Sequence, residues 1–367
     1  MTTIVSSAAV NMKERYTLFP IQNRPIFSLY EDQVKAVWTP YEIDFSEDLK
    51  DLKKMKKEER DLILRVLAFF AQSDSIVNEN LALRFMQDVN IPEMLQFYSF
   101  QIGIEAIHAH TYALMIDNYV SDTEEKDFLF NAIKNFPTIA KKAAWMKKWI
   151  SSQENFSKRL LAFALVEGVF FSASFCTIYW FKDKNKLKGL SQANDLINRD
   201  ESSHVQGAAL LYNELVKMDQ KIRKNQFTLN SRVADLPEAE LGRLLKENFF
   251  IKKSMLNNGQ EFKQIKEEDA FEIVRESVEI EKEFFKEALK VQLLGINSDL
   301  MCQYVEHVAD LVLTQFGLNK LYNAKQPFDF MIKNDIRGKV NFFEHRSSEY
   351  VVAKRESVNF DIINDKF

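Results

Sequence analysis

The chain has 367 residues, 46% of them hydrophobic, so it is long enough to bury a sizeable core as one large domain or two small ones. Only 9 glycines and 7 prolines are present, which argues against a loop-rich β protein and favours long helices. The 49 Lys and Arg residues nearly balance the 53 Asp and Glu residues, and the net charge of −4 argues against a nucleic-acid-binding surface.

The predicted elements are almost all helices. Residues 1–15 are expected to form a disordered arm, and residues 16–50 an extended segment followed by a short helix that ends near Trp38. A charged connector then leads into the long helices, one of which starts at Pro92, since proline is favoured at the first helical position. We expect these helices over roughly 57–85, 92–119, 137–151, 155–182, 188–217, 266–292 and 297–321.

Two segments lie outside this series. Residues 219–262 have high charge and a narrow apolar stripe at positions 241, 244, 245 and 249, which predicts a surface insertion with an added helix. Residues 343–367 are polar with isolated apolar residues, which predicts a flexible tail. The sequence therefore predicts one main domain over residues 16–342.

The segment Leu160–Trp180 is apolar enough to raise the question of a membrane span. It is 21 residues long and carries one charge, Glu167. The chain has no second such segment and no basic asymmetry on its flanks. A helix that is apolar all round is also what the centre of a large bundle requires, so we expect this helix in the core rather than in a membrane.

Cysteine content and the N-terminal sequence bear on the compartment. The two cysteines, Cys176 and Cys302, provide no disulfide framework and no metal-binding spacing, which fits a reducing cytosol. The first residues lack the apolar stretch of a signal peptide. We therefore expect a cytoplasmic protein.

Two Glu-x-x-His pairs, Glu105/His108 and Glu201/His204, are the most informative motifs. A three-residue step places Glu and His on one helix face, across one turn. One such pair alone is more often a solvated helix surface. Here two further acids, Asp74 and Glu167, lie in apolar stretches, where acids are rarely found without partners.

Four carboxylates in one apolar pocket would repel each other by about 4 kcal/mol for a pair roughly 4 Å apart at an effective dielectric near 20. Two divalent cations would balance the four charges. Acids from two helices and Glu-x-x-His from two others are the ligand pattern of ferritin-like dimetal-carboxylate bundles, with Asp74 here in place of one Glu. Oxygen and imidazole donors suit iron or manganese. The sequence therefore predicts an all-α, ferritin-like bundle with additional helices.

The neighbours of these residues indicate what the metals could do. Tyr112 follows His108 by four residues, and Phe171, Phe175 and Ile197 lie at helical spacings from Glu167 and Glu201. A phenol walled by apolar side chains suits a protected tyrosyl radical. Ordinary core packing explains the same periodicity, so spacing alone leaves both interpretations open.

Several stretches together resemble the small, radical-generating subunit of class I ribonucleotide reductase, in its eukaryotic and large-DNA-virus form. The similarity covers about residues 16–350, apart from 219–262, and is specific in combination. The matching stretches are AVWTPYEIDF, LAFFAQSDSIVNENL, FQIGIEAIHAHTYALMID, VEGVFFSASF, LINRDESSH, QPFDFM and GKVNFFEHRSSEY.

The resemblance implies roles for particular residues. The implied metal ligands are Asp74, Glu105, His108, Glu167, Glu201 and His204. Tyr112 matches the radical tyrosine, and the implied transfer route runs from His108 through Asp200 to Trp38. Tyr350 matches the tail tyrosine that passes the radical on. The tail itself, with Phe360, Ile362, Ile363 and Phe367 as apolar anchors, matches the segment that docks on the large subunit.

The implied activity is ribonucleoside-diphosphate reductase, in which this chain is active only with the large subunit. Two iron ions and O₂ would generate the tyrosyl radical, with Mn/Fe or two Mn also open, and the implied assembly is a homodimer. A ferritin-like oxidase or monooxygenase, or an iron-storage protein, would explain the six ligands but would not need Trp38–Asp200 or a docking tail.

The chain departs from the related sequences at three places. Ala109-His110 stands where Ser-Glu is usual, and His110 is expected to point away from the metals because it lies two residues past His108. Ser202-Ser203 replaces Gly-Leu, and the segment 219–262 is longer than usual.

Overall fold

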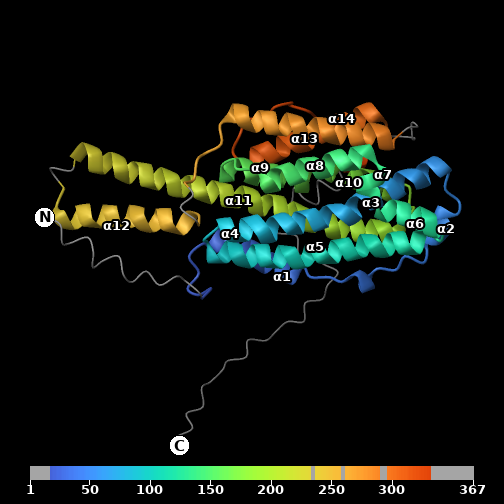
Figure 1. The fold of residues 1–367 in the computed structure, drawn as a ribbon, viewed down its shortest axis with the longest axis horizontal. Coiled ribbons are helices and arrows are strands. Elements are labelled where there is room, and N and C mark those ends of the chain that lie inside the picture. The colour runs from blue at the N-terminus through green and yellow to red at the C-terminus, as the bar shows by residue number, and fades with distance from the viewer. Residues whose placement is uncertain (1–16, 233–235, 258–260, 290–295, 332–367) are drawn as a thin grey trace, which may run out of the picture. The chain divides into compact units, whose positions relative to one another are not determined.

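The structure is a computed structural model, and it describes residues 17–232, 236–257, 261–289 and 296–331 (Figure 1). The chain divides into two units, Met1–Pro327 and Phe328–Phe367. Only residues 328–331 of the second unit are described, so all helices discussed below belong to the first.

The all-α prediction is confirmed, since the described residues contain helices and no β-strand, with one isolated bridge between Val89 and Leu256. The longer helices are α1 Arg24–Lys35, α3 Lys57–Asn80, α5 Pro92–Tyr119, α6 Thr123–Phe130, α8 Pro137–Ser151, α9 Phe156–Leu165, α10 Ser172–Asp183, α11 Lys188–Arg232, α12 Glu238–Met255, α13 Glu267–Ala288 and α14 Ser298–Gln315. The shorter ones are η1 Pro40–Glu42, α2 Asp48–Leu52, η2 Leu81–Phe85, α4 Met86–Asp88, α7 Ala132–Asn135 and η3 Val166–Phe170, of which η2 and η3 are π-helical turns.

Local sequence explains several helix starts. Asn23, Asn155 and Asn297 each accept a hydrogen bond from a backbone N–H of the first turn of α1, α9 and α14. Proline occupies the first turn of α5 and α8, where a missing N–H costs nothing. These signals place the site-bearing helix α5 at the predicted boundaries.

Four helical segments form the centre of the bundle. Helix α3 packs along α5, and α9 and α10 pack on α11, which also contacts α5 (Figure 1). Helices α8, α13 and α14 cover the side formed by α9, η3 and α10. The core therefore brings together the helices that carry both Glu-x-x-His pairs and both single acids.

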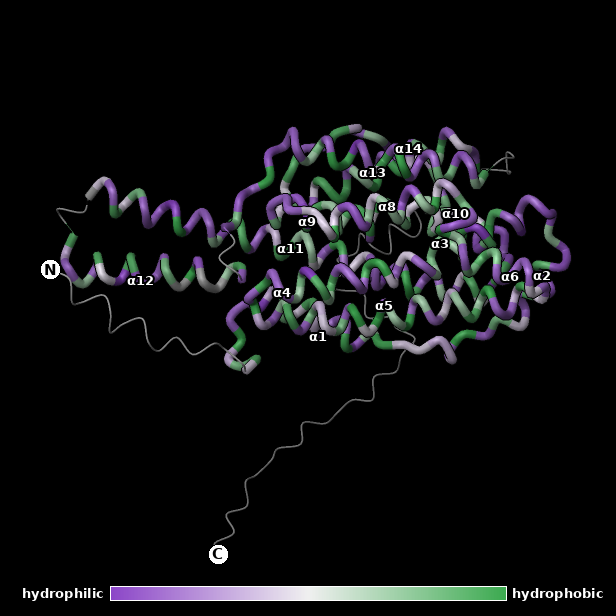
Figure 2. The backbone as a smooth tube through the Cα atoms, in the orientation of Figure 1, coloured by the Kyte–Doolittle hydropathy of each residue, from purple (hydrophilic) through white to green (hydrophobic). Residues whose placement is uncertain are grey.

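Helix α11 is longer than the sequence analysis predicted, because it continues past residue 217 to Arg232. After Gly207 the next glycine or proline is Pro237, so nothing in between interrupts a helix. Helix α12 packs against this extension, where Asn225 donates to Asn248 at 3.0 Å. The extension is largely hydrophilic (Figure 2), and Phe227 on it is exposed.

The apolar stretch examined as a membrane span lies in Phe156–Asp183, which is long and apolar enough to cross a membrane. Of its most apolar window, 94% is buried inside the protein. Its hydropathy is therefore that of a core helix, interrupted at η3 by the turn that carries Glu167.

Candidate dimetal site

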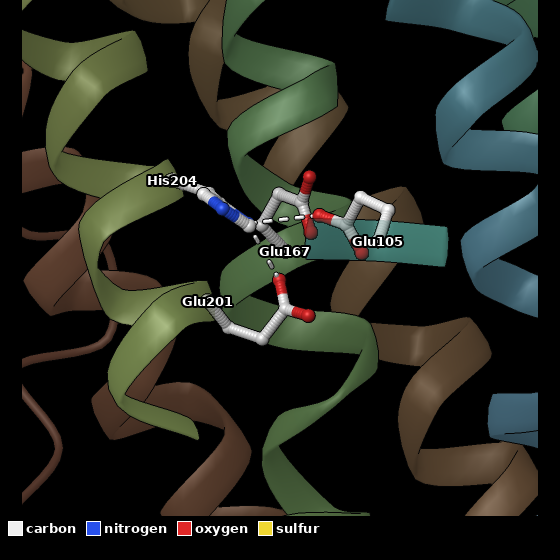
Figure 3. A group of neighbouring side chains, drawn as sticks. All are labelled: Glu105, Glu167, Glu201 and His204. Carbon is white, nitrogen blue, oxygen red and sulfur yellow. Dashed lines mark hydrogen bonds and ion pairs between the residues drawn. The ribbon is translucent and has the colours of Figure 1, made fainter. Parts of the chain in front are cut away.

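Six acidic and imidazole side chains from four helical segments converge in the bundle centre. Their potential ligand atoms form two groups, each with all atoms within 4.8 Å of one another. One group is Glu105, Glu167, Glu201 and His204 (Figure 3), and the other is Asp74, Glu105 and His108. All six side chains are buried, and Glu105 belongs to both groups. Two such groups with one carboxylate in common have the donor atoms to hold two neighbouring cations.

Each imidazole faces the carboxylate of the other Glu-x-x-His pair. His108 Nδ1 lies 3.0 Å from Glu201 Oε1, and His204 Nδ1 lies 2.9 Å from Glu105 Oε1. The contacts within each pair are longer, at 3.3 Å and 3.2 Å. The two helices α5 and α11 are thus linked through the site rather than merely packed beside it.

Burial and mutual charge shift the acid–base equilibria of the cluster. Burial, and then the charge of Glu105, raise the pKa of Asp74 well above its usual range. Burial and the charge of Glu201 do the same to the pKa of Glu167. Burial opposes protonation of His204, but Glu105 and Glu201 outweigh it and raise its pKa to about 9. Without a cation, protons must therefore neutralise part of the site.

The turn that presents Glu167 is held by close neighbours. Gln101 Nε2 donates to Glu167 Oε1 at 3.0 Å from α5. A Cβ atom on Gly168 would lie 2.9 Å from Val312 Cγ2 and 3.4 Å from Val205 Cγ2, so only glycine lets α14 and α11 approach this turn. The sequence analysis missed Gln101, although it precedes Glu105 by four residues and so shares its helix face.

Tyr112 is buried one helical turn after His108, and its hydroxyl has no hydrogen-bond partner. Burial and the charges of Asp74, Glu201 and Glu105 raise its pKa well above the usual range, so the phenol is neutral. Its ring stacks on Phe70, with 4.5 Å between centroids. The sequence analysis missed Phe70, although it precedes Asp74 by four residues on α3.

Of the three predicted wall residues, Phe171 and Phe175 pack against Phe70, at 5.4 Å and 5.1 Å between ring centroids. Ile197 is buried on α11, four residues before Glu201. Phe171 and Phe175 therefore form part of the apolar surroundings of the Phe70–Tyr112 stack.

A hydrogen-bonded route leads out of the cluster. Asp200 Oδ2 lies 3.3 Å from His108 Nε2 and accepts a bond of 2.7 Å from Trp38 Nε1. The Trp38 and His108 rings are stacked with their centroids 5.9 Å apart. Burial would raise the pKa of Asp200, but His108 and the charge of Arg199 outweigh burial and lower it, so Asp200 is an anion between two ring N–H groups.

Other predicted positions lie elsewhere. His110 is exposed on α5 and packs edge-on against Tyr41, outside both ligand groups. Tyr350, Phe360, Ile362, Ile363 and Phe367 lie outside the described residues.

Comparison with solved structures relates the fold to known proteins. The ribonucleotide reductase Rnr4 homodimer from Saccharomyces cerevisiae aligns with a TM-score of 0.66 at 28% identity, covering 89% of this chain and 90% of that one. The ribonucleotide reductase R2 subunit from Clostridium botulinum aligns with a TM-score of 0.66 at 21% identity, covering 85% and 88%. These similarities confirm the ferritin-like bundle.

Sequence relatives agree over nearly the whole chain. The ribonucleoside-diphosphate reductase small chain of Trypanosoma brucei brucei is 42% identical over 340 residues, covering 93% of this chain and 88% of that one. The small subunit of Plasmodium falciparum (isolate FCR-3 / Gambia) is 41% identical over 358 residues, covering 96% and 97%. The family profile "Ribonucleotide reductase, small chain" matches residues 15–241 and 244–327. The chain therefore belongs to the ribonucleotide reductase small-chain family.

Proposed function

We propose that the six clustered side chains bind two metal ions and that this site generates a radical on Tyr112, which the reductase large subunit uses. The observation that carries the proposal is the pair of overlapping ligand groups that share Glu105. A carboxylate common to two groups of this size suits two cations better than one. The bound metals would supply the redox chemistry with O₂ that oxidises the phenol.

The donor atoms fit such a pair of cations. Both carboxylate oxygens of Asp74 and Oε2 of Glu167 are buried without a hydrogen-bond partner. Buried polar atoms are rarely left unpaired, so their orientation toward the cluster indicates a ligand role. Carboxylate and imidazole donors suit iron and manganese, and we propose two iron ions, with Mn/Fe or two Mn as the other combinations.

The protein contributes a buried, neutral phenol next to the cluster. Tyr112 must lose one electron and its phenolic proton to become a neutral radical. Among the carboxylates, Asp74 has the charge that raises the Tyr112 pKa most, so the phenol keeps its proton until the ring is oxidised. Stacking on Phe70 then holds the ring in place and keeps water away from it.

The chain Trp38–Asp200–His108 is proposed as the first part of the transfer route. An anionic Asp200 joins both rings by hydrogen bonds, so a proton can shift along the same path as an electron. Tyr350 and the tail anchored by Phe360, Ile362, Ile363 and Phe367 would complete the route at the large subunit. An oxidase or an iron-storage protein would have no use for this route, which disfavours both alternatives.

The proposal also covers the domains of the chain and its assembly. Residues 16–342 would form the radical-generating domain, 219–262 a surface insertion, and 343–367 the docking tail. The exposure of Phe227 and Phe249 supports the assignment of the insertion as peripheral. We also propose a cytoplasmic homodimer, since a similar solved chain is a homodimer and no disulfide joins the two cysteines, both of which the structure describes.

Metal uptake tests the ligand assignment. Wild-type protein should bind about two ions per chain, and Glu105→Ala or His108→Ala should lower that number and remove the gain in melting temperature on loading. His110→Ala is the matched control for His108, because His110 is on the same helix but outside both ligand groups. Full uptake by both ligand variants would contradict the assignment.

The raised pKa values predict a pH dependence of metal binding. Asp74, Glu167, His108 and His204 all have raised pKa values, so protons compete with metal ions for these groups. Metal ligands must be deprotonated, so loading should release protons and affinity should increase with pH. For His204 this gain should continue to about pH 9, its pKa. Calorimetry in buffers of different ionisation enthalpy measures the release, and heats independent of the buffer would contradict it.

A further inference from the structure

A buried ion pair lies behind the turn that presents Glu167. Lys142 on α8 and Glu281 on α13 are both fully buried, with 2.6 Å between Lys142 Nζ and Glu281 Oε2. Replacing such a pair by apolar residues of similar volume is often neutral or stabilising. Stability alone therefore gives no reason for a lysine and a glutamate here.

The lysine contacts the site-bearing turn directly. Lys142 Nζ donates a hydrogen bond of 2.6 Å to the carbonyl oxygen of Phe170, the last residue of η3. Ser172 Oγ donates at 2.7 Å to the Val169 carbonyl beside it. Helix irregularities persist where side chains satisfy the carbonyls that a regular ladder would use. These two donors thus hold the end of the π-turn that contains Glu167.

The same ammonium group also touches the aromatic wall near Tyr112. Lys142 Nζ lies 3.4 Å from the ring centroid of Phe69 and 4.1 Å from that of Phe284. Phe69 packs against Phe70, the ring that stacks on Tyr112, at 5.6 Å between centroids. One ammonium group therefore contacts both the Glu167 turn and a ring that packs on Phe70.

We propose that Lys142 is a positioning residue for the metal site: its ammonium, oriented by Glu281, fixes the Phe170 carbonyl and so holds the turn in the shape that directs Glu167 at the cluster. Lys142 is not one of the clustered ligands, and it acts on Glu167 through the backbone of η3. The expected effect of Lys142 on metal affinity rests on the proposed function, whereas its expected effect on the conformation of the turn does not.

A double variant separates positioning from stability. Lys142→Met/Glu281→Leu removes both charges together, so no unpaired ion is left in the core, and the melting temperature should change little. Lys142→Met/Glu281→Gln serves the same comparison if leucine cannot be accommodated. The neighbouring pair Lys141–Glu283 joins the same two helices on the surface, so Lys141→Met/Glu283→Gln is the matched control.

Hydrogen exchange on the metal-free protein is the first measurement. The amides of residues 168–173 should exchange about tenfold faster in the Lys142/Glu281 variant, with the ends of α8 and α13 unchanged. The surface control should match wild type. If the amides of η3 exchange at wild-type rates in the folded double variant, the proposal is wrong, since the turn then keeps its shape without Lys142.

Mn(II) titration, with free Mn(II) followed by paramagnetic resonance, is the second measurement. Affinity in the double variant should fall about tenfold, the usual effect of losing a group that orients a ligand. Glu281→Gln keeps Lys142, its bond to Phe170 and an amide oxygen that can orient the ammonium, so affinity should stay near the wild-type value. An equal loss of affinity there, with amide exchange in η3 at wild-type rates, would assign the effect to the charge pair and overturn the role of Lys142. If wild-type protein binds no Mn(II), the proposed metal site fails, while hydrogen exchange still decides whether Lys142 holds the turn.

Discussion

Tyr112→Phe is expected to abolish both the tyrosyl radical and the reductase activity while metal uptake stays at about two ions per chain. Phenylalanine has no phenolic proton to lose, so the ring cannot form a neutral radical at this site. The Tyr112 hydroxyl makes no hydrogen bond, so its removal should change the free energy of unfolding by less than about 1 kcal/mol. Paramagnetic resonance, metal analysis and thermal unfolding on one preparation measure all three effects.

Tyr98→Phe provides the control for this prediction. Tyr98 is also on α5, is fully buried, and has a hydroxyl without a partner, but its phenol lies near Asp88 and Arg159 rather than near the cluster. Its replacement should leave radical and activity in place. If the tyrosyl signal persists in Tyr112→Phe and disappears in Tyr98→Phe, the radical resides on Tyr98 and its assignment to Tyr112 is wrong.

Trp38→Phe is expected to leave the Tyr112 radical intact and to lower turnover with the large subunit at least about a thousandfold, or about 4 kcal/mol in the barrier. Phenylalanine is much harder to oxidise than tryptophan and cannot donate the 2.7 Å bond to Asp200. The radical would then remain on Tyr112 with no route outward. The radical yield is measured before the variant is mixed with the large subunit, and nucleotide reduction is measured after mixing.

Trp145→Phe tests whether any lost indole bond has this effect. The buried Trp145 donates to Glu276 at 3.0 Å and is not part of the chain Trp38–Asp200–His108. Its ring packs on Phe170 with 5.1 Å between centroids, so metal content is measured in the same preparation. Turnover in this variant should stay close to wild type. Near-normal turnover in Trp38→Phe would instead show that the radical leaves the site by another path.

The spacing of Glu and His residues and the apolar sequence around the acids were enough to predict which side chains form the cluster. The two Glu-x-x-His pairs each had to share a helix face, and the structure brings them together with Asp74 and Glu167 in one buried cluster. Such a prediction works because a charged group in an apolar helix is costly unless a partner neutralises it. Helix α5 matched its predicted boundaries for the equally local reason that Pro92 sets its first turn.

Other features depended on geometry that periodicity does not encode. Phe171 lies four residues after Glu167, but η3 is a π-turn, so the angle between the two side chains differs from that in an α-helix. Phe171 therefore packs on Phe69 and Phe70, and Phe70 is the ring that stacks on Tyr112. Lys142 on α8 donates to the Phe170 carbonyl at the end of this turn, and no local sequence pattern predicts a donor from a distant helix.

The most direct test is paramagnetic resonance of wild-type protein loaded with iron(II), exposed to O₂, and labelled with ring-deuterated tyrosine. Our account predicts about two irons per chain and a radical signal whose hyperfine splitting collapses on labelling, because the unpaired electron resides on a tyrosine ring. Full iron loading with no radical, or with a signal that deuterated tyrosine leaves unchanged, would contradict the claim that this site stores its oxidising equivalent on Tyr112.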